Sequence, residues 1–406
     1  MKKLISLLMA MALLLSCVGF AAAEDAVNLM VWIGGDKETD WINGVIEAFQ
    51  AANPDTTYNI TVGVVTYETV GVTALQDPEA TADVFVFPDD RLHELVRGGL
   101  LQPVVVDTEA VIERNGGEGS GAMAASMVDG QLYAYPLSAS NGYFMFYNSE
   151  YFTPEDVSSF DSMAKIAAEH GKQVSFPVMN PWYSYGFYAA AGLSVGLDED
   201  GVSNVCDWNT KTDPFSGLQV LQALLDLVAT PGFTDADSDA FVASVKDGSI
   251  IAGVSGTWNA NIAKEAWGDS YAATKLPTYT LDGQQVQIRS FAGYKLVGVN
   301  SYSPNVGDAM DFANFMTDYD SQMSRFILLD DGPSNIQAAA SDEVMANPAI
   351  AALAAQSDFA DPQQVGGYFW EPAYTLGAII VAGNPEGTDL QTLLDNTVAG
   401  IVTPIQ

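Results

Sequence analysis

Three tryptophans stand next to polar, turn-forming residues, where an aromatic face can meet a ligand. Trp182 follows an Asn-Pro pair, Trp258 follows a Gly-Thr pair, and Trp370 precedes a Glu-Pro pair. A position in the hydrophobic core explains each tryptophan taken singly. Taken together, flat aromatic faces with amides and charged groups at their edges suit the apolar faces and hydroxyl rims of pyranose rings. The three tryptophans therefore predict a site that binds by stacking and hydrogen bonding.

Residue types that carry catalysis or bind metals form no recognisable group in the sequence. His93 and His170 are its two histidines, and neither lies near another metal-type ligand, so zinc and triad chemistry are unsupported. Residues 235–239 resemble the start of a calcium loop. However, Ala240 occupies the glycine position of such a loop and Lys246 the position of its bidentate acid. We interpret this segment as a solvated helix start, and we predict no catalytic residue, no metal and no cofactor.

Alternating strands and helices must position these residues. Strand-like runs at 28–33, 58–65 and 83–87 alternate with helical patterns, which indicates βαβ units and a mainly parallel sheet. Asp129-Gly130 predicts a hairpin turn, and we place a crossing between two lobes shortly after it. Further runs predict strands at 133–137, 143–147, 249–254 and 293–299, and helices that start at Asp213-Pro214 and near residues 309 and 389.

The length and composition favour two globular units. The chain has 406 residues, of which 48% are apolar and 11% aromatic. Single cores usually stop growing near about 250 residues, so two units are expected. The aromatic content argues against disorder. We therefore predict an α/β protein of two lobes, each a mainly parallel sheet flanked by helices.

The charge is strongly acidic, with 51 Asp and Glu against 15 Lys and Arg and a net charge of −36. Such a surface repels nucleic acid and anionic membrane headgroups, and it steers anionic substrates poorly. A neutral or cationic ligand is easier to accommodate. The acidity also keeps an abundant protein soluble, which explains it without any ligand.

The N-terminus is typical of an export signal. Residues 2–15 combine two lysines with a nearly continuous apolar run, which is too short to span a bilayer. Small residues at 21–23 favour cleavage after Ala23, whereas Cys17 lies in a segment that resembles a lipoprotein box, so two processing routes remain open. Cys206 would then have no partner, and we expect no internal disulfide.

Several further motifs follow one another in an order that carries a family resemblance. They lie at 31–37 (VWIGGDK), 83–91 (DVFVFPDDR), 99–101 (GLL), 135–136 (YP), 147–148 (YN), 180–182 (NPW), 255–258 (SGTW), 276–277 (LP), 298–300 (GVN), 303–304 (SP) and 369–370 (FW). With these motifs the chain resembles the family 1 extracellular solute-binding proteins of ABC importers, and within them the maltose/maltodextrin-binding proteins. The resemblance covers nearly all of the chain after the export signal.

The resemblance implies a type II periplasmic-binding-protein fold with a hinge between the lobes. It implies an N-terminal lobe of residues 24–139 and 291–336 and a C-terminal lobe of residues 140–290 and 337–406. It also implies ligand contacts. Polar contacts match Asp36, Lys37, Asp90 and Arg91, and aromatic platforms match Trp182, Trp258 and Trp370. Four positions depart from the family pattern but keep their place in the predicted site: Phe87, Asn141, Asn180 and Glu371.

The function that the resemblance implies is capture of a neutral, maltodextrin-like oligosaccharide between the lobes by hinge closure, for delivery to the permease subunits of an ABC importer. We expect a secreted monomer at the outer face of the cell membrane or in the periplasm, bound to the membrane only through a lipid anchor at Cys17 if that route is used. Two alternatives remain. The acidity favours another solute such as a polyamine, and the number of carboxylates leaves room for the paired acids of a glycoside hydrolase.

Overall fold

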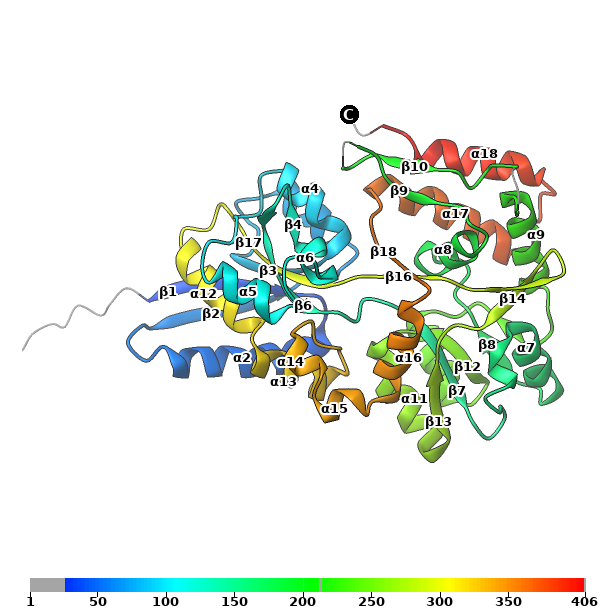
Figure 1. The fold of residues 1–406 in the computed structure, drawn as a ribbon, viewed down its shortest axis with the longest axis horizontal. Helices are drawn as coiled ribbons and strands as arrows, with labels where there is room; N and C mark the ends of the chain where they lie inside the picture. The colour runs from blue at the N-terminus through cyan, green and yellow to red at the C-terminus, as the bar shows by residue number, and fades with distance from the viewer. Residues whose placement is uncertain (1–25, 200, 212–213, 405–406) are drawn as a thin grey trace, which may run out of the picture.

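The computed structural model describes residues 26–199, 201–211 and 214–404. The predicted export signal, Cys17 and the predicted helix start at Asp213 lie outside these residues. Two lobes stand side by side along the long axis of the molecule (Figure 1). Within the described residues, no helix is both long and apolar enough to cross a bilayer.

The first lobe is built on a five-stranded sheet with helices on both faces. Its strand order is β2 (Tyr58–Val64), β1 (Val27–Ile33), β3 (Val84–Pro88), β17 (Lys295–Val299) and β6 (Ala134–Ser138). Side chains alternate across β3, because successive residues of a strand point to opposite faces. Val84 and Val86 pack with α2 (Thr39–Ala52) and α12 (Val306–Met316). Phe85 and Phe87 pack with α3 (Val70–Gln76) and α4 (Leu92–Arg97) on the other face.

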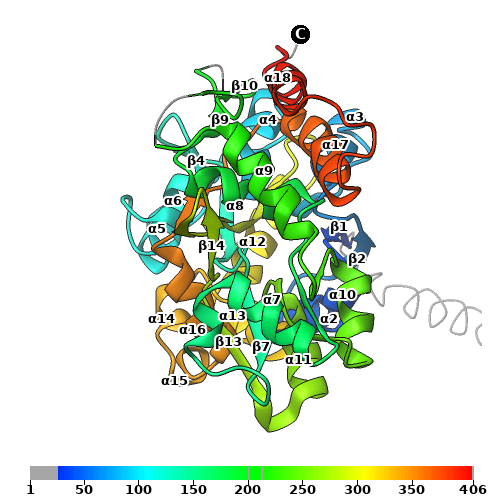
Figure 2. The same ribbon diagram turned by 90° about the vertical axis from the view of Figure 1, so that its right-hand side faces the viewer.

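The second lobe has its own five-stranded sheet and its own cores. The order is β11 (Phe233–Thr234), β8 (Gln173–Ser175), β12 (Ile250–Ser255), β7 (Phe144–Asn148) and β13 (Tyr271–Thr274). Figure 2 shows this lobe in front, with α7 and α9 toward the viewer. Its helices are α7 (Phe160–Glu169), α8 (Pro181–Ala190), α9 (Gly217–Val228), α10 (Ser238–Lys246), α11 (Ala260–Trp267), α16 (Pro348–Ser357), α17 (Trp370–Val381) and α18 (Leu390–Ile401).

The predicted two-lobed α/β class is confirmed, but the strand directions differ from the expected mainly parallel sheets. In the first sheet β1 runs parallel to β2 and β3, whereas β17 runs antiparallel to β3 and β6. In the second sheet β8 runs parallel to β11 and β12, whereas β7 runs antiparallel to β12 and β13. The physical reason is that β7 and β17 each follow a passage of the chain from the other lobe. Their direction is therefore not fixed by a connecting helix within one lobe, as it is in a βαβ unit.

The chain passes between the lobes on neighbouring segments that form the hinge. One passage joins β6 to β7, and another joins β16 (Ser290–Ala292) to β17. β18 (Ala360–Pro362) pairs in parallel with β16 between the lobes (Figure 1). A backbone hydrogen bond from Asn141 N to Gly293 O at 3.3 Å links the two passages, and one from Ala139 N to Gly332 O at 2.9 Å ties the first passage to the segment between α13 and α14.

Two short helices after the predicted boundary at 336 pack on the first lobe. Ala338 and Val344, from α14 (Ile336–Ala339) and α15 (Asp342–Met345), share a small core with Met323 and Phe326 of α13 (Tyr319–Leu329).

The remaining elements are short and connect those described above. The helices and strands among them are α5 (Thr108–Arg114), α6 (Gly121–Ser126), β4 (Met127–Val128), β5 (Gln131–Leu132), β9 (Val195–Leu197), β10 (Asn204–Cys206), β14 (Thr278–Leu281) and β15 (Gln284–Gln287). The 3-10 turns are η1 (Asp36–Glu38), η2 (Asp89–Arg91), η3 (Asp156–Ser158), η4 (Thr257–Asn259), η5 (Gly268–Ser270) and η6 (Gly367–Phe369).

Candidate ligand-binding site

Trp182 is placed by the start of helix α8. The side chain of Asn180 caps the helix by accepting a hydrogen bond from Trp182 N at 3.0 Å, and Pro181 occupies the first helical position. An Asn cap followed by proline is a strong helix start, so Trp182 is fixed in the first turn. Its ring packs edge-on against Tyr143 with centroids 4.7 Å apart, and it stays half-buried.

Trp258 lies in η4, directly after strand β12. Its ring covers Gly256, where a Cβ atom would come within 2.0 Å of the indole. The Trp182 and Trp258 rings are 5.7 Å apart and tilted by 42°. The two half-buried rings therefore form one angled aromatic surface.

Trp370 begins helix α17 and packs edge-on against Phe369 at 4.9 Å. It adjoins the same apolar cluster of the second lobe as Trp182. Its indole N–H is buried and has no hydrogen-bond partner among the described residues. A buried donor without a partner is costly, so this N–H is an exception to the usual pairing of buried polar groups. Glu371, in the same helical turn, is exposed.

Asp90 and Arg91 form η2 at the end of strand β3. Their side chains are buried, with Arg91 Nε 3.6 Å from Asp90 Oδ2 and Arg91 Nη1 3.4 Å from Glu94 Oε2. Within the described residues, Asp90 Oδ1 and Arg91 Nε have no hydrogen-bond partner. One acceptor and one donor thus lie unpaired in a buried position at the start of the helix, which is unusual for polar groups in a protein interior.

Burial sets the protonation of Asp90. It raises the pKa of Asp90 to about 6, although Arg91 and an amide hydrogen bond from Gln363 act to lower it. Asp89, the preceding residue, has a pKa raised well above its usual range by burial and then by the charge of Asp90. Asp90 is therefore the carboxyl of this pair that becomes charged near neutral pH.

Lys37 connects the first lobe to Trp258. Its Nζ lies 3.5 Å from the Trp258 carbonyl oxygen. Partial burial, and then the nearby Lys295, lower the pKa of Lys37. Asp36 precedes it in η1 and is exposed. Of the two residues, it is Lys37 that enters the site from the first lobe, at its Trp258 end.

A cavity of about 440 Å³ lies between the lobes next to Lys37 and Trp258. Charged residues of the first lobe line one side, and the η4 region with the adjoining helices of the second lobe lines the other. The lining residues are Lys37, Glu38, Lys295, Arg325, Leu328, Leu329 and Asp331, facing Asp239, Val242, Thr257, Trp258, Asn259, Asn261 and Ile262. Both lobes thus contribute walls to one concave space.

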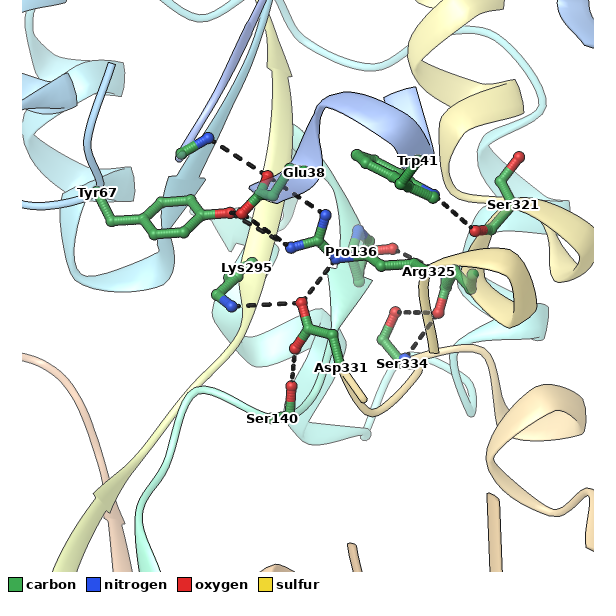
Figure 3. Close-up of polar contacts among 12 residues, drawn as sticks. Glu38, Trp41, Tyr67, Pro136, Ser140, Lys295, Ser321, Arg325, Asp331 and Ser334 are labelled. Carbon is green, nitrogen blue, oxygen red and sulfur yellow. Dashed lines mark hydrogen bonds and ion pairs between the residues drawn. The ribbon is translucent and has the colours of Figure 1, made fainter. Parts of the chain in front are cut away.

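Buried ion pairs form the first-lobe wall of this cavity (Figure 3). Arg325 lies between Glu38, at 3.3 Å, and Asp331, at 2.6 Å, and Lys295 lies 3.3 Å from Asp331. Although burial acts to raise it, Lys295 and Arg325 hold the pKa of Asp331 well below its usual range. Arg325 and Lys295 likewise lower the pKa of Glu38 against the effect of burial. These four charges, which sequence reasoning did not single out, are mutually neutralised and hold η1, α13 and β17 together.

Gln363, which sequence reasoning missed, joins several predicted residues. Its side-chain oxygen accepts hydrogen bonds from Trp182 Nε1 at 2.6 Å and from Asn141 Nδ2 at 3.3 Å, and its amide lowers the pKa of Asp90. The signal in the sequence is weak, since Gln363 is one of two adjacent glutamines after an Asp-Pro pair. Only the fold brings it to residues 90, 141 and 182.

Two residues that were expected to contact the ligand, Phe87 and Asn180, make other contacts in the structure. Phe87 is completely buried in the first-lobe core with Phe85 at 5.5 Å, because its position in β3 points it toward α3 and α4. The structure therefore does not bring Phe87 to the cleft. The Asn180 side chain is occupied locally, since it caps α8 and donates to Asp237 Oδ2 at 2.8 Å. Asp235 also binds this segment, through Met179 N at 3.0 Å.

The assembled site can hold a polar, ring-shaped molecule by stacking and hydrogen bonding. Aromatic faces come from the second lobe, and charged and amide groups come from the first lobe and the hinge. Among the residues that the structure describes, no cluster of three His, Cys, Asp or Glu could bind a metal ion. The arrangement is that of a two-lobed binding protein with its ligand site at the interface of the lobes.

The chain belongs to the bacterial extracellular solute-binding proteins, whose family model matches residues 44–352, about three quarters of the chain. This confirms the resemblance predicted from the ordered motifs. A comparison with curated protein sequences found no match.

Solved structures support the same fold. The chain is 28% identical to a protein solved with acarbose, with a TM-score of 0.81 over 93% of this chain and 99% of that one. It is 23% identical to the maltodextrin-binding protein from L. casei BL23, with a TM-score of 0.77 over 93% and 100% of the two chains. It is 19% identical to the maltotriose-binding protein of Thermus thermophilus, with a TM-score of 0.76 over 92% and 98%. The last two similarities concern the fold alone.

Proposed function

We propose that this protein captures a neutral, maltodextrin-like oligosaccharide between its lobes and delivers it to the permease subunits of an ABC importer. The observation that carries the proposal is the angled Trp182–Trp258 surface facing polar groups of the other lobe. The similarity to a protein solved with acarbose supports the same ligand class. The site acts by binding alone.

Hinge closure follows from the division of the site. The tryptophans belong to the second lobe, whereas Lys37, Asp90 and Arg91 belong to the first. A sugar can contact both sets only when the lobes are together, so binding shifts the population toward the closed form. In this proposal, the closed form is the one that docks on the importer.

The charges around the cleft favour a neutral sugar over a polyamine. Although the whole chain is acidic, the first-lobe face of the cleft carries Lys37, Lys295 and Arg325 together with Glu38 and Asp331. Asp239 of the second lobe adds a third carboxylate, so the lining has no excess of negative charge that would attract a ligand with several positive charges. The overall acidity is therefore attributed to the outer surface, where it favours solubility.

Isothermal titration of the purified protein with maltotriose, acarbose and spermidine tests the proposal. We expect binding of the two saccharides and none of spermidine. Incubation with maltodextrins should release no new reducing ends, which separates binding from hydrolysis. Binding of spermidine without saccharide binding would refute the ligand class, and new reducing ends would refute the absence of catalysis.

A further inference from the structure

Gln363 sits on the hinge and is almost completely buried. It directly follows β18, and its backbone N–H donates to the oxygen of Ala292, the last residue of β16, at 3.1 Å. Only 5% of the residue is exposed. Both its backbone and its side chain are therefore held where the two lobes meet.

The orientation of the Gln363 amide follows from chemistry. An indole N–H can only donate, so the Gln363 atom 2.6 Å from Trp182 Nε1 must be the oxygen. The same oxygen accepts from the Asn141 amide at 3.3 Å. The NH2 group then lies on the opposite side of the planar amide, where it can donate to the Asp90 carboxylate.

The partners of this single amide come from different parts of the molecule. Trp182 belongs to the second lobe, Asp90 to the first, and Asn141 to the passage between β6 and β7. Two further approaches show that the lobes meet beside it. A Cβ atom on Gly367 would lie 4.0 Å from Arg91 Nη1, and one on Gly201 would lie 3.6 Å from His93 Nδ1. Separation of the lobes would pull Asp90 and Trp182 apart.

We propose that Gln363 is a positioning residue that couples the Trp182 platform of one lobe to Asp90 of the other when the lobes close. Its oxygen fixes the indole edge, and its NH2 group fixes one side of the carboxylate. The Trp182 ring itself is only half-buried, so it can still meet a ligand. The role in sugar affinity rests on the function proposed above, whereas the coupling itself does not need a sugar.

The coupling is tested in the full-length protein without ligand by the indole N–H resonance of Trp182 in ¹H–¹⁵N spectra, assigned with Trp182→Phe. In Gln363→Leu we expect this resonance to move upfield, because a short hydrogen bond is lost. Gln364→Leu, at the exposed neighbouring position, is the matched control and should leave it in place. Asp90→Asn should move it in the wild-type background and not in the Gln363→Leu background. A resonance that stays in place in Gln363→Leu overturns the proposal.

Maltotriose titration then tests the effect on binding. Gln363→Leu should weaken binding about tenfold, the usual effect of a lost hydrogen bond to a charged group, and Gln364→Leu should not. Gln363→Glu keeps the acceptor for Trp182 but sets a second carboxylate against Asp90, so it should also weaken binding. Equal affinity of all three variants and the wild type refutes the role in binding. If the wild type binds no saccharide, the function proposed above fails, while the resonance still decides the coupling.

Discussion

Arg325 Nε lies 2.6 Å from Asp331 Oδ2, and both side chains are almost fully buried. The pair joins helix α13 to the segment beside the hinge. Asp331 also accepts a hydrogen bond from Ser140, on the passage between β6 and β7, and pairs with Lys295 (Figure 3). One carboxylate therefore contacts three separate parts of the chain close to the point where they change lobes.

Removal of the arginine should destabilise the fold strongly. Arg325→Met takes away the cation between Glu38 and Asp331 and leaves buried carboxylates with less compensation, which typically costs about 3–5 kcal/mol. Urea unfolding of the first lobe measures the loss. Arg97→Met, at an exposed position of α4, is the control and should change stability by less than about 0.5 kcal/mol. Equal stability of the two variants would contradict the role of the ion pairs.

Acid should remove the contribution of the Asp331 carboxylate to the free energy of unfolding. Its pKa is held below the ordinary value, so the stabilisation is present above about pH 4, the unfolded-state pKa, and is lost as the pH falls through the lower folded-state value. The stability difference between the wild type and Asp331→Asn should therefore shrink steadily below pH 4. Urea titrations at pH 7, 5, 4 and 3 measure it, and a constant difference would argue against this prediction.

Trp258 should matter for ligand binding more than for folding. Its ring is half-buried, and aromatic stacking contributes about 1 kcal/mol beyond burial. Trp258→Ala should weaken maltotriose binding at least about fivefold with a small change in melting temperature. Trp41→Ala, in the first-lobe core, should show the reverse pattern. A Trp258→Ala protein that unfolds early yet binds normally would identify Trp258 as a core residue.

A side chain at position 256 should weaken sugar binding by displacing the Trp258 ring, which covers Gly256. An added Cβ would come within 2.0 Å of the Trp258 indole, while the backbone, with φ of −105°, accepts alanine without strain. Gly256→Ala should therefore displace the ring and lower sugar affinity as far as Trp258→Ala does. Gly35→Ala, where nothing lies within 4 Å of the added atom, is the matched glycine control. Normal binding by Gly256→Ala would show that the ring position is unimportant.

Sugar affinity should rise with pH through the pKa of Asp90, about 6. A sugar hydroxyl donates more strongly to a carboxylate than to a neutral acid, so binding favours the charged form. Arg91, Glu94 and Asp89 are the other charged or titratable groups around this carboxyl. Titration calorimetry between pH 5 and 7.5 should show affinity increasing several-fold, and Asp90→Asn should remove that increase. The same slope in both proteins would exclude Asp90 as its source.

Local patterns predicted most of the elements because they depend on neighbouring residues. The Asp129-Gly130 turn is present between β4 and β5, with φ of 51° and 78° at its two residues. The three strands predicted first along the chain, β1, β2 and β3, begin and end within about one residue of their predicted bounds. The predicted helix start at Asp213-Pro214 was wrong, because α9 begins at Gly217 with Ser216 as its N-cap. Ser216 and Gln219 form a reciprocal capping box, which satisfies two backbone donors at once.

Individual residues of the candidate site could be predicted only where the residue type itself indicates a chemical role. Tryptophans and charged pairs beside turns carry such a signal, and the structure brings Trp182, Trp258 and Lys37 together. Gln363 and Arg325 carry none, because their partners lie far away in the sequence. Phe87 shows the opposite error, since a position taken from a family pattern fell on the core-facing side of a strand.

The position of β17 in the first sheet has a consequence for the way the protein is made. This strand lies between β3 and β6, yet it is encoded more than 150 residues after β6. The N-terminal half emerging from a ribosome therefore carries two unjoined pieces of sheet with nothing between them. The first lobe can be completed only after most of the second has been synthesised, and such late, long-range pairing is intrinsically slow.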